Sequence, residues 1–201
     1  MTRFVCVSDT HGFSPELPEG DVLIHAGDFC MNGAMSEVRS FKTWLDKQDF
    51  KHKIVIAGNH DFPFERKSEE ARKALEGSCT YLQDSGVEVD GFKVWGSPWQ
   101  PWFFDWAFNL RRGSALKDKW AMIPEGTDVL VTHGPPRGVL DMTSRGERVG
   151  CDDLAERLSK LKVKLHVFGH IHEAYDLTYR DGTCFVNASI VDRNYSPVHK
   201  P

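Results

Sequence analysis

The sequence has no long apolar run and only five cysteines. No run approaches the roughly 18 apolar residues that a membrane-spanning helix needs. The first residues enter a strand-like alternation without the basic and apolar segments of a secretory signal, so we expect no such signal. The cysteines are odd in number and show no C-x-x-C spacing, which argues against a disulfide framework and against a cysteine-rich zinc site. We therefore predict a soluble, cytoplasmic protein with no membrane partner.

An excess of basic residues is also missing. The 25 Lys and Arg residues are outnumbered by 29 Asp and Glu residues, and the formal net charge is −4. Proteins that bind long nucleic acids usually carry a basic domain or stripe, so we expect no long nucleic acid as a partner. A small anionic ligand is compatible with this charge if its site is locally positive, for example through bound metal ions.

Length and composition indicate one ordinary globular domain. At about 150 residues per domain, the 201 residues predict a single domain spanning residues 1–201. The chain is 40% apolar and 27% charged, with 17 Gly and 10 Pro, which excludes fibrous and disordered classes. A chain of this length buries roughly 70% of its unfolded surface, so its core needs no disulfides.

Strand-like and helical patterns alternate along the chain. We predict strands at 3–8, 22–26, 53–57, 129–132, 165–168 and 184–188, and helices at 35–48, 65–76, 113–122 and 151–161. Asp-Gly pairs at 90–91 and 181–182 predict two hairpins, which add antiparallel strands. The pattern therefore predicts an α/β fold with a mixed sheet. In such folds, functional residues collect at the carboxyl ends of the strands.

Residues able to bind metals follow these strands directly. The clusters read D-x-H at 9–11, G-D at 27–28, G-N-H-D at 58–61, T-H-G-P-P at 132–136 and G-H-x-H at 169–172. Oxygen and imidazole side chains on loops at one sheet edge can converge on metal ions, and the glycines permit tight turns beside them. One such cluster arises often by chance, whereas five in this order indicate a metal site.

The five motifs together resemble those of the calcineurin-like metallophosphoesterase superfamily. The segments IVIAGNHD (54–61), WGSPWQPW (95–102), THGPP (132–136) and LHVFGHIHE (165–173) are similar to the branch of metallophosphoesterase-domain-containing proteins. The resemblance runs from residue 9 to residue 172, most of the chain. It implies the superfamily's four-layer α/β/β/α sandwich with two mixed sheets.

The resemblance also implies two divalent metal ions that share one carboxylate. The first would be held by Asp9, His11, Asp28 and His172, and the second by Asp28, Asn59, His133 and His170. A carboxylate that bridges two dications about 3.5–4 Å apart reduces their mutual repulsion. Mixed oxygen and nitrogen sites accept Mn²⁺, Fe²⁺, Co²⁺ or Zn²⁺, of which Mn²⁺ is our first expectation.

The implied activity is hydrolysis of a small phosphodiester, with cyclic nucleotides as the leading substrate class. A metal-bridging hydroxide would attack phosphorus, and the two metals would stabilise the developing charge. Asn59 and His60 are expected to contact the substrate, and His60 to act as the catalytic proton donor. Alternatives are a nuclease or a phosphomonoesterase on the same centre, or a low-activity nucleotide-binding scaffold. The presence of both His170 and His172 favours catalysis over the scaffold.

The partner that orients His60 is not evident from the sequence. Phosphoprotein phosphatases carry an aspartate three residues after the G-D aspartate, and here that position is Met31. This departure argues against a protein phosphatase. The neighbouring Asp61 has no predicted role, because adjacent side chains often point apart.

Two further groups of residues have an ordinary structural interpretation. The segment 95–108 is dense in aromatic residues, which favours core packing, and the sharper hypothesis is that Trp99, Trp102 or Phe103 stacks on a nucleobase. His25 and His166 fall inside predicted strands, where a buried histidine with a hydrogen-bond partner is expected.

Overall fold

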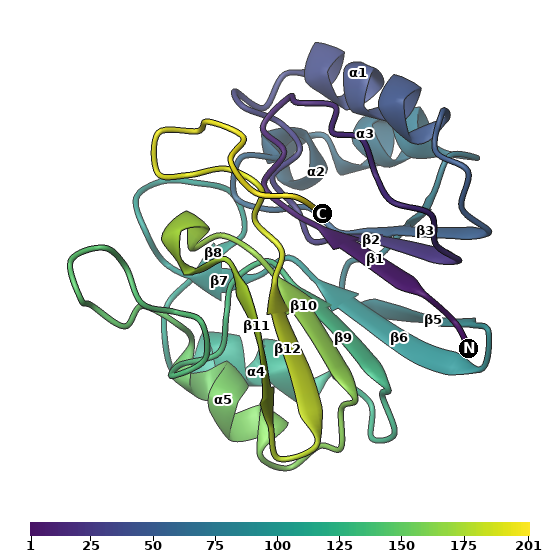
Figure 1. Cartoon of the computed structure of the whole chain (residues 1–201). Helices are drawn as coiled ribbons and strands as arrows, with labels where there is room; N and C mark the ends of the chain where they lie inside the picture. Colours follow the sequence, from purple (N-terminus) through teal and green to yellow (C-terminus); the bar gives the residue numbers. More distant parts are fainter.

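The computed structural model describes residues 1–201, and two sheets lie at its centre (Figure 1). The first sheet has the order β1-β2-β3-β4. Its strands are β1 Phe4–Val7, β2 Val22–His25, β3 His52–Val55 and β4 Thr80–Tyr81. The second sheet has the order β11-β12-β10-β9-β6-β5. Its strands are β5 Ser85–Val89, β6 Phe92–Ser97, β9 Val129–Thr132, β10 Leu165–Phe168, β11 Asp176–Arg180 and β12 Thr183–Asn187.

The second sheet is mixed, as predicted. Its central pairs β6–β9, β9–β10 and β10–β12 are parallel, while β5–β6 and β11–β12 are antiparallel hairpins. The hairpins turn at Asp90-Gly91 and Asp181-Gly182, where all four residues have positive φ angles. That geometry matches the twist of the flanking strands, which explains why the Asp-Gly signal located both hairpins.

The first sheet corrects the prediction of two mixed sheets, because all three of its strand pairs are parallel. The chain between successive strands of this sheet crosses back over a long loop or over helices, and such crossovers join parallel strands. Both hairpin turns fall in the other sheet, so nothing reverses the strand direction here. A fourth, two-residue strand was not predicted, since Thr80–Tyr81 is too short to show a period.

Helices cover the outer face of each sheet (Figure 1). Residues of α1 Met35–Leu45, α2 Phe62–Arg66 and α3 Ser68–Leu75 share one buried cluster with the first sheet. Residues of α4 Ser114–Ala121 and α5 Asp152–Leu158 share another with β9. A third cluster lies between the sheets, where Ile24 and Ile54 meet Val94 and Val131. The α/β fold is thereby confirmed, with the two sheets packed between helices.

The predicted helix at 65–76 is two helices. Pro63 lies in the first turn of α2, a position that suits its fixed φ angle and its missing N–H. The helix therefore begins at Phe62, before the predicted start at residue 65. Lys67 then leaves the helical region with φ −136° and ψ 45° before α3 begins. The remaining elements are the short pair β7 Gln100–Pro101 and β8 Asn109–Leu110, and the 3₁₀ turn η1 His172–Ala174. None of the helices is both long and apolar enough to cross a membrane.

Candidate metal centre

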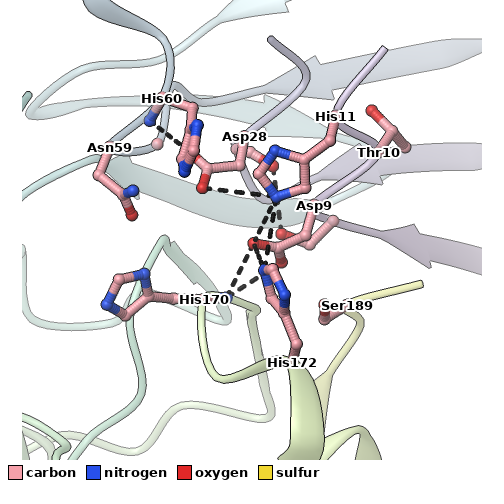
Figure 2. Close-up of polar contacts among 12 residues, drawn as sticks. Asp9, Thr10, His11, Asp28, Asn59, His60, His170, His172 and Ser189 are labelled. Carbon is pink, nitrogen blue, oxygen red and sulfur yellow. Dashed lines mark hydrogen bonds and ion pairs between the residues drawn. The ribbon is translucent and has the colours of Figure 1, made fainter. Parts of the chain in front are cut away.

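The seven predicted ligands and His60 come together where the two sheets meet. Figure 2 labels all of them except His133. Each follows the carboxyl end of a strand, so the parallel strands deliver their side chains to one edge. The first sheet supplies Asp9, His11, Asp28, Asn59 and His60, and the second supplies His133, His170 and His172. The site is thus built by both sheets rather than by one.

One group of donor atoms consists of Asp9, His11 and His172, whose ligand atoms lie within 4.8 Å of one another. The Nε2 atom of His172 is 3.3 Å from Oδ1 of Asp9 and 3.4 Å from Nε2 of His11. Nε2 of His11 is also 3.9 Å from Oδ2 of Asp28, which links this group to the next.

A second group consists of Asp28, His133 and His170. The Nε2 atom of His133 is 3.4 Å from Oδ2 of Asp28 and 2.8 Å from Oδ1 of Asn59. The ring of His170 lies beside that of His133, with centroids 5.0 Å apart. Asp28 therefore stands between the two groups, where a bridging ligand would have to be.

Backbone carbonyls orient three of the imidazoles. The Nδ1 atoms of His11, His133 and His172 lie 3.1, 2.9 and 3.0 Å from the carbonyl oxygens of Cys30, Ala26 and Asp192, respectively. A carbonyl only accepts, so each Nδ1 carries a proton and each Nε2 faces the centre. A cation that binds there displaces any proton on Nε2 and takes its lone pair. This is how metal-binding histidines are usually held.

The donor set fits divalent cations. With Nδ1 protonated, the Nε2 lone pairs of His11 and His172 face each other across 3.4 Å, and the carboxylate oxygens of Asp9 and Asp28 point to the same space. Acceptors crowded in this way repel one another unless a cation lies among them. Oxygen and imidazole ligands are those that Mn²⁺, Fe²⁺, Co²⁺ and Zn²⁺ accept.

Two glycines leave room for the carboxylates. A Cβ atom at Gly58 would overlap Oδ1 of Asp28, and one at Gly169 would overlap Oδ2 of Asp9. At both positions the backbone passes so close to a proposed ligand that no larger residue fits. The glycines in the G-N-H-D and G-H-x-H motifs therefore serve close approach.

Burial and mutual charge set the protonation of the centre. Burial raises the pKa of Asp28, but the charge and hydrogen bond of His133 outweigh it and lower that pKa well below its usual range. Burial lowers the pKa of His133, but Asp28 raises it to about 9. Burial lowers the pKa of His170 to about 3. Ionised carboxylates beside a neutral His170 are the forms that bind cations.

His60 forms a third group of donor atoms with His11 and Asp28, whose ligand atoms also lie within 4.8 Å of one another. Its Nδ1 is 2.7 Å from the carbonyl oxygen of Met31, and its backbone N–H donates to Oδ1 of Asp28 at 2.7 Å. The carbonyl of Met31 thus occupies the role that a side-chain aspartate would play. Sequence reasoning missed this partner because every residue type offers the same carbonyl.

Asp61 ties two of the ligand loops together. Its carboxylate accepts the backbone N–H groups of Asp28 at 2.8 Å, Cys30 at 2.9 Å and Gly58 at 2.8 Å. The side chain is fully buried, and burial together with the charge of Asp28 raises the pKa of Asp61 to about 7. This residue, left unassigned from the sequence, fixes the turns that carry Asp28 and Asn59.

Two aromatic residues other than Trp99 and Trp102 contact the histidines of the centre. The indole N–H of Trp99 donates to Asp84 at 2.8 Å, and Trp102 is 60% exposed with no contact to the centre. Instead, the ring of Trp106 lies 4.6 Å from that of His60, and Tyr195 lies 4.8 Å from His11. Trp106 belongs to the aromatic segment noted in the sequence, whereas no motif marks Tyr195.

The chain is similar to known proteins along its whole length. Residues 2–174 match the family model of calcineurin-like phosphoesterases. Metallophosphoesterase domain-containing protein 1 of Homo sapiens is 47% identical over 226 residues, covering 100% of this chain and 69% of the human protein. A UPF0046 protein of Caenorhabditis elegans is 39% identical over 231 residues, covering 99% of this chain and 58% of the worm protein.

A solved structure shows the same fold at low sequence similarity. The crystal structure of the protein TT1561 of Thermus thermophilus matches with a TM-score of 0.65 and 13% identity, covering 93% of this chain and 89% of that chain. The arrangement of the sheets is therefore shared well beyond the relatives that the sequence identifies.

Proposed function

This chain belongs to the calcineurin-like phosphoesterase family, and from that premise we propose that it is a phosphodiesterase using two divalent metal ions. The observation that carries the proposal is the convergence of two donor groups on Asp28, with His60 beside them. Family membership supports metal-dependent hydrolysis of phosphoesters. The preference for diesters is our own inference.

The proposed ligands are those that both sheets bring to the centre. Asp9, His11, Asp28 and His172 would hold one metal, and Asp28, Asn59, His133 and His170 the other. When bound, two such cations supply Lewis acidity, a more acidic water and charge stabilisation at the phosphoryl oxygens. Mn²⁺ is the metal we propose to test first.

His60 is proposed as the proton donor. Because Nδ1 donates to the Met31 carbonyl at 2.7 Å, Nε2 is the atom left to carry a proton to the leaving oxygen. The ring is held on its flanks by His11, at 4.7 Å between centroids, and by Trp106 at 4.6 Å. Such packing keeps the donor in one orientation, which proton transfer requires. Asn59 is the second side chain proposed to contact the substrate.

Cyclic nucleotides are the substrate class we propose. The aromatic rings of Trp106 and Tyr195 flank His60, at 4.6 and 5.8 Å between centroids, and can stack on a nucleobase whose phosphate lies at the metals. The net charge of −4 speaks against a long nucleic acid. All five cysteines are free thiols, which supports our proposal of a cytoplasmic location.

The experiment removes the metals with a chelator, restores Mn²⁺, and compares hydrolysis of a bis-aryl phosphate diester with that of the aryl monoester. We expect metal-dependent cleavage of the diester, and its loss in Asp28→Asn. Asp152→Asn, on an exposed carboxylate paired with Arg112, is the matched control. Faster cleavage of the monoester would instead make the protein a phosphomonoesterase, and no cleavage of either compound would favour a scaffold.

Two further measurements address the substrate. A nuclease would lose affinity for its substrate steeply as the salt concentration rises, whereas hydrolysis of a mononucleotide should change little.

Trp106→Ala should raise the Michaelis constant for a cyclic nucleotide by roughly tenfold, since one stacked base contributes about 1–3 kcal/mol. Trp102→Ala, an exposed tryptophan in the same segment, is the control and should leave that constant unchanged.

A further inference from the structure

Strand β11 forms an open edge of the six-stranded sheet (Figure 1). It pairs with β12 on one side only, and four of its five residues are exposed. Natural edge strands are usually protected by proline, by a bulge or by charged side chains, lysine above all. The β11 sequence Asp-Leu-Thr-Tyr-Arg contains neither proline nor lysine, its charges lie only at its two ends, and its pairing with β12 is regular throughout.

The hairpin geometry decides which backbone groups face outward. Arg180 and Thr183 close the two-residue turn, and in such a hairpin the closing pair exchanges hydrogen bonds. Bonded and non-bonded pairs then alternate, so the backbone groups of Leu177 and Tyr179 point away from β12. The only bond that either group makes is local, from the Leu177 N–H to Oδ1 of Asp176 at 2.7 Å.

The strand is complementary to itself in the antiparallel direction. If Thr178 lies on a two-fold axis, Leu177 faces Tyr179 of a second copy, and the outward backbone groups of these two residues form hydrogen-bonded pairs. In the same register Asp176 faces Arg180 of the second copy, so opposite charges meet at both ends. This alignment satisfies hydrogen bonding, apolar contact and charge together.

Apolar side chains lie beside this edge. Leu177 is 49% exposed and Tyr179 is 73% exposed, and they share the face of the sheet that carries Cys184 and Val186. That face borders a groove of about 790 Å³ between the two sheets, lined mainly by apolar residues. A second copy in the aligned register would place its Tyr179 over Leu177 and cover part of this surface.

We propose that the chain forms a two-fold symmetric dimer through β11, joining two six-stranded sheets into one continuous sheet. The occupant of the edge is a second copy of this chain, because the strand is complementary to itself in hydrogen bonding, apolar contact and charge when read in reverse. The interface lies outside the metal centre and is independent of the proposed function.

The test is a charge swap followed by sedimentation velocity at micromolar and at sub-millimolar concentration. The unaltered chain should sediment with twice the monomer mass as concentration rises. Asp176→Arg and Arg180→Asp each place like charges opposite each other and should sediment as monomers. An equimolar mixture of the two variants should form a heterodimer, because every pair is then complementary, and the double variant should dimerise again.

The mixture separates a broken interface from a damaged fold. Arg180 also donates to the carbonyl of Gly138 at 2.8 Å, so its variant loses one contact within the chain. A folding defect would not be repaired by mixing, whereas charge pairing would. Leu177→Lys, at an exposed position, provides a second monomeric variant. A monomer at every concentration, or dimers in both single charge variants, would overturn the proposal.

Discussion

Asp9, His11, Asp28 and His170 hold left-handed backbone conformations, with φ of 54°, 42°, 56° and 68°. Residues with a Cβ atom enter this region at a cost of about 1–2 kcal/mol each. Four such residues in one cluster therefore reduce the stability of the fold. Strain of this kind persists at functional sites, where it positions the side chains that the function requires. The same turns aim the side chains of Asp9 and His11 at one donor group and those of Asp28 and His170 at the other.

The first prediction concerns His60. Replacing it with Gln keeps a side chain that can reach the Met31 carbonyl but removes the proton carried at Nε2. We expect turnover of the diester to fall about 10²–10⁴-fold, the range for loss of a general acid. Metal content, measured by elemental analysis, should stay near that of the unaltered chain. Full turnover in His60→Gln would show that the histidine is structural.

The second prediction concerns the pH dependence of stability. His166 is fully buried, its Nε2 lies 2.8 Å from the Thr132 hydroxyl, and burial lowers its pKa from 6.5 to about 3. A histidine whose pKa is lower in the folded protein contributes stability above pH 6.5, and this contribution is lost as pH falls toward 3. Between about pH 7.5 and pH 5 the loss is about 2 kcal/mol.

His166→Gln keeps a donor for Thr132 and cannot titrate in this range. Its free energy of unfolding should therefore fall less than that of the unaltered chain between the two pH values. Urea titrations with chelator present in both samples measure the difference without interference from metal release. Equal pH dependence of the two proteins would mean that His166 does not stay neutral in the fold.

At the scale of elements, the centre depends on loops that hold one another. The turns after β2 and β3 are joined by the Asp61 carboxylate, which accepts three backbone N–H groups from Asp28, Cys30 and Gly58. Backbone amides that point at a carboxylate cannot find other partners in a buried site. The positions of Asp28 and Asn59 therefore depend on a residue that we do not propose as a ligand.

The third prediction follows from this contact. Asp61→Asn turns one acceptor oxygen into an NH₂ group that faces a backbone N–H. We expect a loss of about 1–3 kcal/mol in the free energy of unfolding, together with weaker Mn²⁺ binding. Urea midpoints and a Mn²⁺ titration measure the two effects, with Asp152→Asn as the control on an exposed carboxylate. Unchanged Mn²⁺ affinity would show that the loops hold their geometry without Asp61.

A feature of the fold or of the site could be predicted from the sequence only where particular residue types mark it. The metal-binding motifs follow strands, and the ends of parallel strands meet by topology, so the sequence predicted the cluster. Asp-Gly turns likewise located both hairpins. The Met31 carbonyl carries no side-chain signature, and Tyr195 reaches His11 from a terminal loop without periodicity. Only the folded chain reveals such contacts.

At the scale of the whole molecule, the centre joins the two sheets. Asp9, His11 and Asp28 come from loops of the first sheet, while His133 and His172 come from loops of the second. Between the sheets the remaining contacts are mainly apolar. A metal bound by residues from both sheets would therefore link the two halves of the fold. Its release should lower the stability of the whole chain rather than loosen one loop.

The fourth prediction is that metal removal destabilises the whole chain. A ligand that binds only the folded state at about 1,000 times its dissociation constant adds about 4 kcal/mol. Chelation should therefore lower the midpoint of thermal unfolding, and Mn²⁺ should raise it in proportion to the logarithm of its concentration. Asp28→Asn removes the ligand that we propose for both metals, so added Mn²⁺ should shift its midpoint far less. If Mn²⁺ shifted the midpoints of Asp28→Asn and Asp152→Asn equally, the stabilising site would lie elsewhere on the molecule.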